Sequence, residues 1–332
     1  MASNPPPHRS ERLEIIVTSK VVTIGEIVVE IMAVHPGDGF REPIELIGPF
    51  PSGAPAIFID QLARQGHPCA MVSCVGDDDF GWLNIERLRK DGVDVSAIRV
   101  HEDAVTGSAF VRYRESGDRD FVFNIRHSAN GHIGLTPEAR AVIAAAGHLH
   151  VMGSSLSSPA IIEAVLFALD EIKGRGGTVS FDPNIRKEML GFPEMRAALD
   201  LVLAGTDLFL PSGDELLLFA DAPDEAAALA QLLGRGLKAI VLKHGSAGAR
   251  YVSADEDISA PGFRVTEVDP TGAGDCFGAT FVAGWLAGRD PAEALLRANA
   301  AGALAVTKKG PMEGVSSTDQ LDDFIASAEP VA

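Results

Sequence analysis

The chain has 332 residues, of which 46 are Asp or Glu and 28 are Lys or Arg, giving a net charge of −18. This charge opposes extended binding to nucleic acid or to an anionic membrane, so an anionic ligand would need a local site. The sequence has no apolar run as long as a membrane span, and its start, "MASNPPPHRSER", lacks the apolar core of a secretory signal. We expect a disordered tail over 1–20 and a globular domain over 21–328.

From Val21 onward, short β-rich runs alternate with segments that have the pattern of helices. The β-rich runs are "VVTIGEIVVEIMAV", "CAMVSCVG", "HLHVMG", "TVSFDPN", "DLFLP" and "KAIVLKHG". This alternation predicts an α/β fold with a doubly wound, mostly parallel sheet flanked by helices. Helix signals agree with it, because Thr136 and Pro137 can open one helix and Gly66 can end another.

The three cysteines are Cys69, Cys74 and Cys276. The odd separation of the first two places them on opposite faces of the predicted strand "CAMVSCVG". An odd set of cysteines with this placement favours a reduced cytoplasm. The cysteines and the nine histidines show no C-x-x-C or H-E-x-x-H spacing, so we do not expect a zinc site.

One region interrupts the alternation of strands and helices. The stretch 106–126, "TGSAFVRYRESGDRDFVFNIR", predicts two strands around a Ser116-Gly117-Asp118 turn, which is a hairpin. Together with the extended stretch 28–50, it predicts a small sheet that projects from the main domain as a lid. The exposed edge of such a sheet is a candidate contact for a homodimer.

A glycine-rich turn lies near the C-terminal end of the chain. We expect a strand, "FRVTEV", to lead into "DPTGAGD", where a helix begins. The backbone amides of Gly272, Ala273, Gly274 and Asp275 can then point at one spot, with the positive end of the helix behind them, which suits a phosphate. The alternative is that Asp275 only caps the helix.

Two other phosphate-binding motifs do not fit this turn. Its spacing is G-x-G-x-x-x-G, and too little chain follows for the second strand of a dinucleotide-binding half. The pattern G-x-x-x-x-G-K-[ST] does not occur in the sequence, which excludes the ordinary P-loop.

The segment "VDPTGAGDCFGATFVAG" resembles the C-terminal signature of the ribokinase, or PfkB, family of carbohydrate kinases. Other stretches resemble the family in the same order, which extends the resemblance over the chain after the tail: "GEIVVE", "SGAPAIFIDQLARQG", "VGDDDFG", "DPNIR", "PSGDE", "KHGSAGA" and "ANAAGALAV". The resemblance implies a doubly wound α/β domain with a β lid over a sugar substrate. It also implies ATP- and Mg²⁺-dependent transfer of phosphate to that sugar.

By this resemblance, Asp275 is the general base that takes the proton of the attacking sugar hydroxyl. The amides of Gly272, Ala273 and Gly274, with that of Asp275, form the anion hole for the transferred phosphate. Glu215 matches the acid that organises Mg²⁺ through water, although Ser212 stands where the family usually has Asn. A solvated acid at a helix start is the alternative for Glu215.

The resemblance also implies a nucleotide site and a cation site. The residues implied at the nucleotide are Lys243, Gly245, Gly248, Thr271, Gly272, Gly274 and Asn299, the last of them beside adenine. Asp269, Thr271 and Gly310 fall where many relatives bind a monovalent cation such as K⁺. Ordinary glycine turns, helix packing and loop structure are the alternatives for these positions.

The sugar-binding residues depart from the family pattern. Glu30 stands in place of its usual Asp and Ile57 in place of its usual Asn, while Gly53 and Ala54 keep the backbone open to a sugar. Arg126 and Arg186 are candidates to bind substrate hydroxyls, a carboxylate or a phosphate, and surface ion pairs are the alternative for both.

We therefore expect an ATP-dependent kinase that phosphorylates the terminal primary hydroxyl of a ketohexose, with tagatose or fructose as the substrate. A 2-keto-3-deoxygluconate kinase is the runner-up, because "DPNIR" and "RHSAN" also resemble that branch. A nucleoside kinase is a third reading. A regulator that binds sugar or nucleotide without catalysis is the reading from another class, and an intact Asp275 argues against it.

Overall fold

The computed structural model describes residues 19–116, 118–125, 127–185, 193–213 and 215–331. Its main feature is a nine-stranded sheet in the order β13-β12-β11-β10-β9-β8-β1-β4-β5. The strands are β1 (Val21–Ile24), β4 (Cys69–Gly76), β5 (Asp94–His101), β8 (His148–Met152), β9 (Thr178–Asp182), β10 (Leu208–Phe209), β11 (Ala239–Lys243), β12 (Ala249–Ser253) and β13 (Asp257–Ala260). Neighbours from β5 to β11 are parallel, while β12 and β13 are antiparallel additions at one edge.

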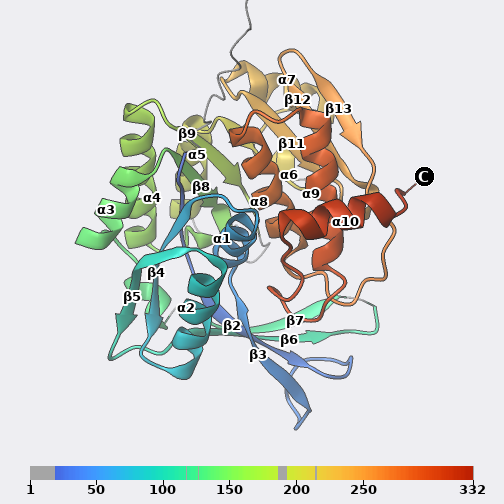
Figure 1. Cartoon of the computed structure of the whole chain (residues 1–332). Helices are drawn as coiled ribbons and strands as arrows, with labels where there is room; N and C mark the ends of the chain where they lie inside the picture. The colour runs from blue at the N-terminus through green and yellow to red at the C-terminus, as the bar shows by residue number, and fades with distance from the viewer. Residues whose placement is uncertain (1–18, 117, 126, 186–192, 214, 332) are drawn as a thin grey trace, which may run out of the picture.

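Helices cover both faces of this sheet (Figure 1). One face packs on α1 (Ala54–Arg64), α2 (Asp79–Asp91), α8 (Ala273–Leu286), α9 (Pro291–Ala305) and α10 (Thr318–Ser327). The other face packs on α3 (Pro137–Ala145), α4 (Pro159–Gly174), α5 (Pro193–Ala204), α6 (Glu215–Leu218) and α7 (Glu225–Gly234). Two hydrophobic cores result, one on each side, and this confirms the predicted ribokinase-like α/β architecture.

Several local predictions are confirmed. Thr136 is the N-cap of α3 and accepts a hydrogen bond from the Ala139 amide, with Pro137 at the first helical position. The side chains of Cys69 and Cys74 lie in different cores, so the two cysteines are on opposite faces of β4. Within the described residues, no helix combines the length and the hydrophobicity that a bilayer crossing requires.

A second, smaller sheet has the order β3-β2-β6-β7 and lies at one end of the main sheet (Figure 1). Its strands are β2 (Val28–Ala33), β3 (Leu46–Ser52), β6 (Gly107–Tyr113) and β7 (Arg119–Asn124). The pairs β2–β3 and β6–β7 are antiparallel, and the central pair β2–β6 is parallel. The structure thus contains the predicted hairpin and unites it with the segment that follows β1. We call this element the small sheet.

The predicted strand "FRVTEV" is wrong. Phe263 makes only an isolated bridge to Pro330, and the following residues have no strand structure. The segment makes its contacts with the C-terminal part of the chain instead, where the Arg264 amide donates to the Glu329 carbonyl at 3.0 Å. The Val268 amide donates to the Val306 carbonyl at 2.7 Å, and the Phe263 ring packs on Phe324 of α10.

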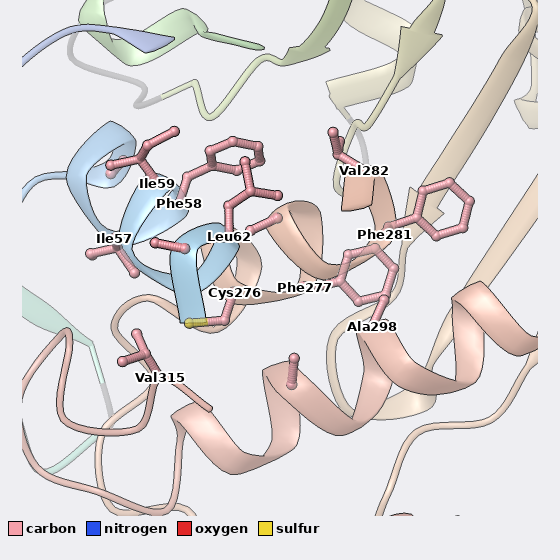
Figure 2. Packing of buried hydrophobic residues seen from close by; sticks show 14 of the residues in the cluster. Ile57, Phe58, Ile59, Leu62, Cys276, Phe277, Phe281, Val282, Ala298 and Val315 are labelled. Carbon is pink, nitrogen blue, oxygen red and sulfur yellow. The ribbon is translucent and has the colours of Figure 1, made fainter. Parts of the chain in front are cut away.

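The packing of α1 against α8 brings the starts of these two helices together. Figure 2 shows Cys276 of α8 beside α1, which carries Ile57, Phe58 and Leu62, and all four side chains are buried. Small residues let the helices approach closely, since α8 carries glycine and alanine at its centre. Apolar burial over this contact therefore fixes the relative position of the two turns that precede the helices.

Candidate active site

The turn before α8 has the geometry of an anion hole. Gly272 is the N-cap residue, with a φ of 84°, and the first intrahelical bond joins the Cys276 amide to the Gly272 carbonyl at 2.9 Å. A Cβ at Gly272 would lie 2.6 Å from the Pro311 carbonyl oxygen, so only glycine fits there. The amides of Ala273, Gly274 and Asp275 follow in the first turn, where backbone donors have no acceptor within the helix. They are thus directed toward one anion position.

Asp275 lies in the first turn of α8 with 8% of its surface exposed. The capping position belongs to Gly272, so Asp275 does not occupy the position that the capping alternative requires. A carboxylate in the first turn is stabilised in its charged form by the positive end of the helix. The structure therefore places a buried carboxylate beside the predicted anion hole.

A buried ion pair lies next to this turn. Lys243, at the end of β11, pairs with Asp182, at the end of β9, and the two side chains are 10% and 2% exposed. A Cβ at Gly274 would lie 3.9 Å from the Lys243 ammonium nitrogen, so this cation borders the anion hole. Because Asp182 balances the charge of Lys243, the ammonium group would act on a phosphate there chiefly as a hydrogen-bond donor. The site residues predicted from the sequence did not include Asp182, although its position at the carboxyl end of a parallel strand is typical of a functional residue.

Glu215 begins α6, and its carboxylate is hydrogen-bonded to the backbone of two earlier segments of the chain. Its two carboxylate oxygens accept hydrogen bonds from the Ile185 and Ser212 amides, each at 2.7 Å. Burial raises the pKa of Glu215, and the neighbouring Asp182 raises it further. Asp182 and Glu215 are oxygen donors of the kind that Mg²⁺ prefers. The described part of the chain contains no cluster of three or more His, Cys, Asp or Glu side chains that could hold a metal ion directly.

The predicted nucleotide turn is built around two glycines with positive φ. Gly245 has a φ of 59° and Gly248 a φ of 108°, and a Cβ at Gly248 would lie 2.1 Å from the Ala260 carbonyl oxygen. Asn299 of α9 donates hydrogen bonds to the Ala260 and Pro261 carbonyls at 3.1 and 3.0 Å. The structure thus brings the turn and Asn299 to the same loop, where backbone packing alone accounts for Gly248.

Asp269, Thr271 and Gly310 come together before the anion hole. The Asp269 carboxylate is 1% exposed, and its two oxygens accept hydrogen bonds from the Thr271 amide at 3.0 Å and the Gly310 amide at 2.9 Å. Gly310 has a φ of 111°, which explains the glycine. This arrangement joins the loop before α8 to the loop after α9.

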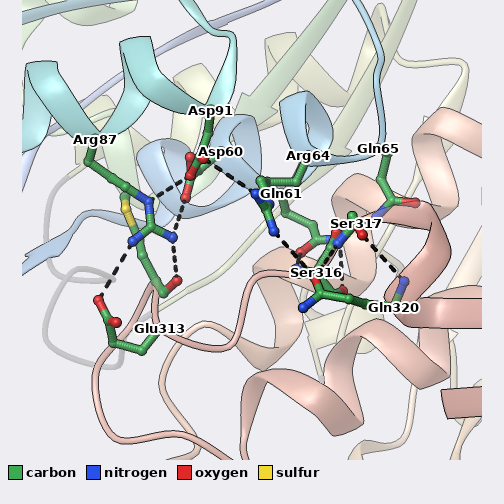
Figure 3. A network of polar contacts seen from close by, with 11 residues as sticks. Asp60, Gln61, Arg64, Gln65, Arg87, Asp91, Glu313, Ser316, Ser317 and Gln320 are labelled. Carbon is green, nitrogen blue, oxygen red and sulfur yellow. Dashed lines mark hydrogen bonds and ion pairs between the residues drawn. The ribbon is translucent and has the colours of Figure 1, made fainter. Parts of the chain in front are cut away.

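Polar residues of α1 and α2 hold the loop after α9 in place (Figure 3). The Arg87 guanidinium lies 3.2 Å from an Asp60 carboxylate oxygen and donates to the Met312 carbonyl at 2.8 Å. Gln61 accepts a hydrogen bond from the Ser316 amide at 2.8 Å and donates to the Ser316 carbonyl at 3.1 Å. Burial raises the pKa of Asp60 to about 8. The loop that borders Gly272 is therefore fixed to the helix that begins at the predicted sugar site.

The predicted sugar residues lie at the start of α1 and in the small sheet. Glu30 of β2 is 4% exposed, and the Ser52 hydroxyl donates to it at 3.4 Å. Gly53 has a φ of 114°, and a Cβ there would lie 2.5 Å from the Glu26 carbonyl oxygen. Ala54 is the first residue of α1, and a methyl carbon of Ile57 lies 3.2 Å from the position of a Cβ on Gly272. Arg126 and Arg186 lie outside the described residues.

A cavity of about 640 Å³ lies at the small sheet, and its lining includes Asp78, Thr106, Phe123 and His127. The Asp78 carboxylate accepts hydrogen bonds from the Thr106 amide and hydroxyl, both at 2.7 Å. These bonds give Asp78 a structural role.

The comparisons with known proteins agree with this geometry. Residues 18–318 match the model of the pfkB family of carbohydrate kinases. A fructokinase from Klebsiella pneumoniae is 34% identical over 310 residues, 91% of this chain and 98% of the relative. A 2-dehydro-3-deoxygluconokinase from Thermoproteus tenax is 31% identical over 315 residues, 92% of this chain and 94% of the relative.

Solved structures show the same likeness. An E. coli protein that is provisionally named ribokinase II, crystallised with ATP and Mg²⁺, is 50% identical with a TM-score of 0.88. The superposition covers 93% of this chain and 99% of that one. With the helix-start carboxylate, the glycine-rich turn and a family match over nearly the whole chain, this protein belongs to the pfkB family of carbohydrate kinases.

Proposed function

We propose that the enzyme transfers the γ-phosphoryl group of ATP to the terminal primary hydroxyl of a ketohexose, fructose or tagatose. The observation that carries the proposal is Asp275, a carboxylate held in the first turn of α8 beside the first-turn amides and the Lys243 ammonium group. Ile57, near the start of α1, borders the same turn, and Gly53 directly precedes that helix. A base, an anion hole and a substrate site therefore lie within one small region.

Asp275 takes the proton of the substrate hydroxyl as its oxygen forms a bond to the γ-phosphorus. The bond between that phosphorus and the β,γ-bridging oxygen breaks, and ADP leaves with the electron pair. In a loose transition state the proton moves late, so a carboxylate is a sufficient base and positioning supplies most of the rate. The amides of Gly272, Ala273 and Gly274 and the Lys243 ammonium group stabilise the charge on the transferred group.

The nucleotide and the cations have candidate residues in the same region. Lys243, Gly245, Gly248, Thr271 and Asn299 would bind ATP. Glu215 would hold Mg²⁺ through water, and the ion would neutralise phosphate charge. Asp269 and Gly310 would border a monovalent cation such as K⁺. The E. coli relative crystallised with ATP and Mg²⁺ supports the first two assignments.

The preference for a ketohexose rests on the pocket and on the fructokinase relative. Ile57 removes an amide that the family pattern offers to sugar hydroxyls, whereas Glu30 keeps a buried carboxylate as an acceptor. Such a site suits a polyol. The second candidate is 2-keto-3-deoxygluconate, supported by the Thermoproteus tenax relative. Its carboxylate would need a cation, and Arg126 or Arg186 would supply one.

A panel of substrates tests the proposal. ADP release is measured with Mg²⁺-ATP and tagatose, fructose, 2-keto-3-deoxygluconate, ribose or adenosine as acceptor. We expect a ketohexose to have the highest kcat/KM. A kcat/KM for the keto acid or adenosine more than about tenfold above every ketohexose, which is about 1.4 kcal/mol, would reject the ketohexose assignment. Absence of turnover with every acceptor would instead favour a non-catalytic regulator.

We further propose a cytoplasmic enzyme that dimerises through the small sheet. The three cysteines are all buried and free, which suits a reducing compartment.

The edge strands of the small sheet expose the apolar side chains of Leu46 and Ile47 on β3 and of Val122 and Phe123 on β7. Analytical ultracentrifugation at micromolar concentration measures the oligomeric state, and a monomer would contradict the proposed dimer.

A further inference from the structure

The small sheet touches the loop that leads into the anion hole. Tyr113, the last residue of β6, donates its hydroxyl hydrogen to an Asp269 carboxylate oxygen at 2.7 Å, across 156 positions of sequence. Arg119 pairs with Tyr113 across the β6–β7 ladder and donates to the Thr271 hydroxyl at 3.5 Å. Two neighbouring side chains of one sheet thus reach two residues of the loop that precedes Gly272.

Asp269 connects Tyr113 of the small sheet to the loops that border the anion hole. Its carboxylate is almost fully buried and also accepts the Thr271 and Gly310 amides, so it joins the small sheet to the loops before α8 and after α9. Burial and the neighbouring Asp269 both raise the pKa of Tyr113. The phenol therefore stays protonated at neutral pH and acts as the hydrogen-bond donor.

The loop has little freedom between Asp269 and the anion hole. Gly272 is the third residue after Asp269, and it is confined by its positive φ and by the Pro311 carbonyl oxygen. A shift of Asp269 would therefore move the amides of the first turn of α8. Positions of catalytic donors matter at this scale, since a displacement of about 1 Å can reduce a rate about 10²-fold.

We infer that Tyr113 is a positioning residue that couples the small sheet, over the sugar, to the anion hole through Asp269. The inference rests on the proposed function, because it takes the small sheet as the cover of the sugar site. A sugar that holds the sheet in this position stabilises the Tyr113–Asp269 bond, and the bond fixes the amides that receive the γ-phosphate. By linkage, sugar and nucleotide then increase each other's affinity by the same factor.

A purely structural hydrogen bond would behave differently. Its loss would lower the melting temperature and leave the mutual effect of sugar and nucleotide unchanged. The discriminating quantity is the coupling factor, defined as the Kd of a non-hydrolysable ATP analogue without fructose divided by its Kd with saturating fructose. Titration calorimetry with Mg²⁺ present gives both constants.

The test compares the wild type with Tyr113→Phe and Tyr251→Phe. Tyr251 is the second of the two tyrosines in the chain, lies on β12 and packs against Phe281, so it controls for loss of a tyrosine hydroxyl. We expect the coupling factor of Tyr113→Phe to fall about tenfold, or to one where the wild-type factor is smaller. The reason is that a hydrogen bond to a charged group typically contributes that much or more. Tyr251→Phe should keep the wild-type factor.

An unchanged coupling factor in Tyr113→Phe would overturn the inference, and so would a wild-type factor of one. Arg119→Met, at an exposed position, gives a second route should Tyr113→Phe fail to fold, and its factor should fall about threefold. Failure of the proposed function is separate, because it appears in the wild type as no turnover of fructose or tagatose. The same proteins are then compared with 2-keto-3-deoxygluconate as the probe.

Discussion

Single residues at the start of α8 determine how a phosphate can approach the backbone. Gly272 and Gly274 both lie in the turn, yet they are glycines for different reasons. Gly272 has a positive φ and no room for a Cβ, whereas a Cβ on Gly274 would meet only the Lys243 ammonium nitrogen, at 3.9 Å. The fold therefore tolerates alanine at Gly274, and the space there is open to the phosphate of the proposed function.

We predict that Gly274→Ala keeps the fold and impairs the reaction. Its melting temperature should be equal to or slightly above that of the wild type, because alanine is favoured over glycine in a helix. The added methyl group lies 3.9 Å from the Lys243 ammonium nitrogen, in the space proposed for the phosphate, so kcat/KM for ATP should fall about 10²-fold. Gly174→Ala, at the end of α4 with open space around it, is the matched control and should leave kcat/KM unchanged. An unchanged kcat/KM in Gly274→Ala would contradict the anion hole.

The elements under the site carry buried polar groups that sequence patterns do not indicate. His148 and His150 of β8 are fully buried, and both contact the Ser180 hydroxyl, at 2.7 and 2.8 Å. Burial lowers the pKa of His148 to about 3 and that of His150 in the same direction. Both rings are therefore neutral in the native sheet and take up protons only when it unfolds.

This arrangement predicts acid sensitivity of the central sheet. The unfolded chain binds the proton first, so the stability due to neutral His148 is lost as pH falls from about 6.5 toward about 3. His148→Gln should reduce the slope of unfolding free energy against pH by about 1.4 kcal/mol per pH unit near pH 5. Urea unfolding at several pH values between 7 and 4.5 gives the slope of the unfolding free energy against pH. Equal slopes for His148→Gln and the wild type would contradict a lowered pKa of His148 in the folded protein.

Element patterns were predictable where local chemistry decides the structure. The Thr136 cap, the alternation of strands and helices, and the β6–β7 hairpin each follow from residues close in sequence. The strand predicted over 263–268 is absent because this segment bonds to Val306 and Glu329 and packs on Phe324 of α10 instead of pairing with a strand. No local pattern carries that information.

At the scale of the whole molecule, the order of motifs along the chain indicated the family, and the comparisons confirm it. The glycine-rich turn was predictable because glycines and Asp275 are contiguous. The Lys243–Asp182 pair and the Tyr113–Asp269 bond were not, because they join residues 61 and 156 positions apart. Such contacts depend on tertiary packing, which only the assembled sheets and helices supply.

With a net charge of −18, the whole molecule does not attract an anionic nucleotide, so the local hydrogen-bond donors at the site must bind it. An acidic molecule repels ATP at long range, so binding must come from fixed local donors. The helix-start amides and the Lys243 ammonium group are such donors, and Asp275 lies in the same first turn of α8. The central claim is therefore that Asp275 acts as the base beside an anion hole.

The most direct test is the turnover number of Asp275→Asn with the acceptor that the wild type prefers. Asparagine keeps the size of the side chain and cannot accept the proton, so kcat should fall about 10²- to 10⁴-fold while the Kd for ATP stays roughly constant. Asp255→Asn, at an exposed position, should match the wild type. A kcat for Asp275→Asn close to that of the wild type would contradict the assignment of Asp275 as the base.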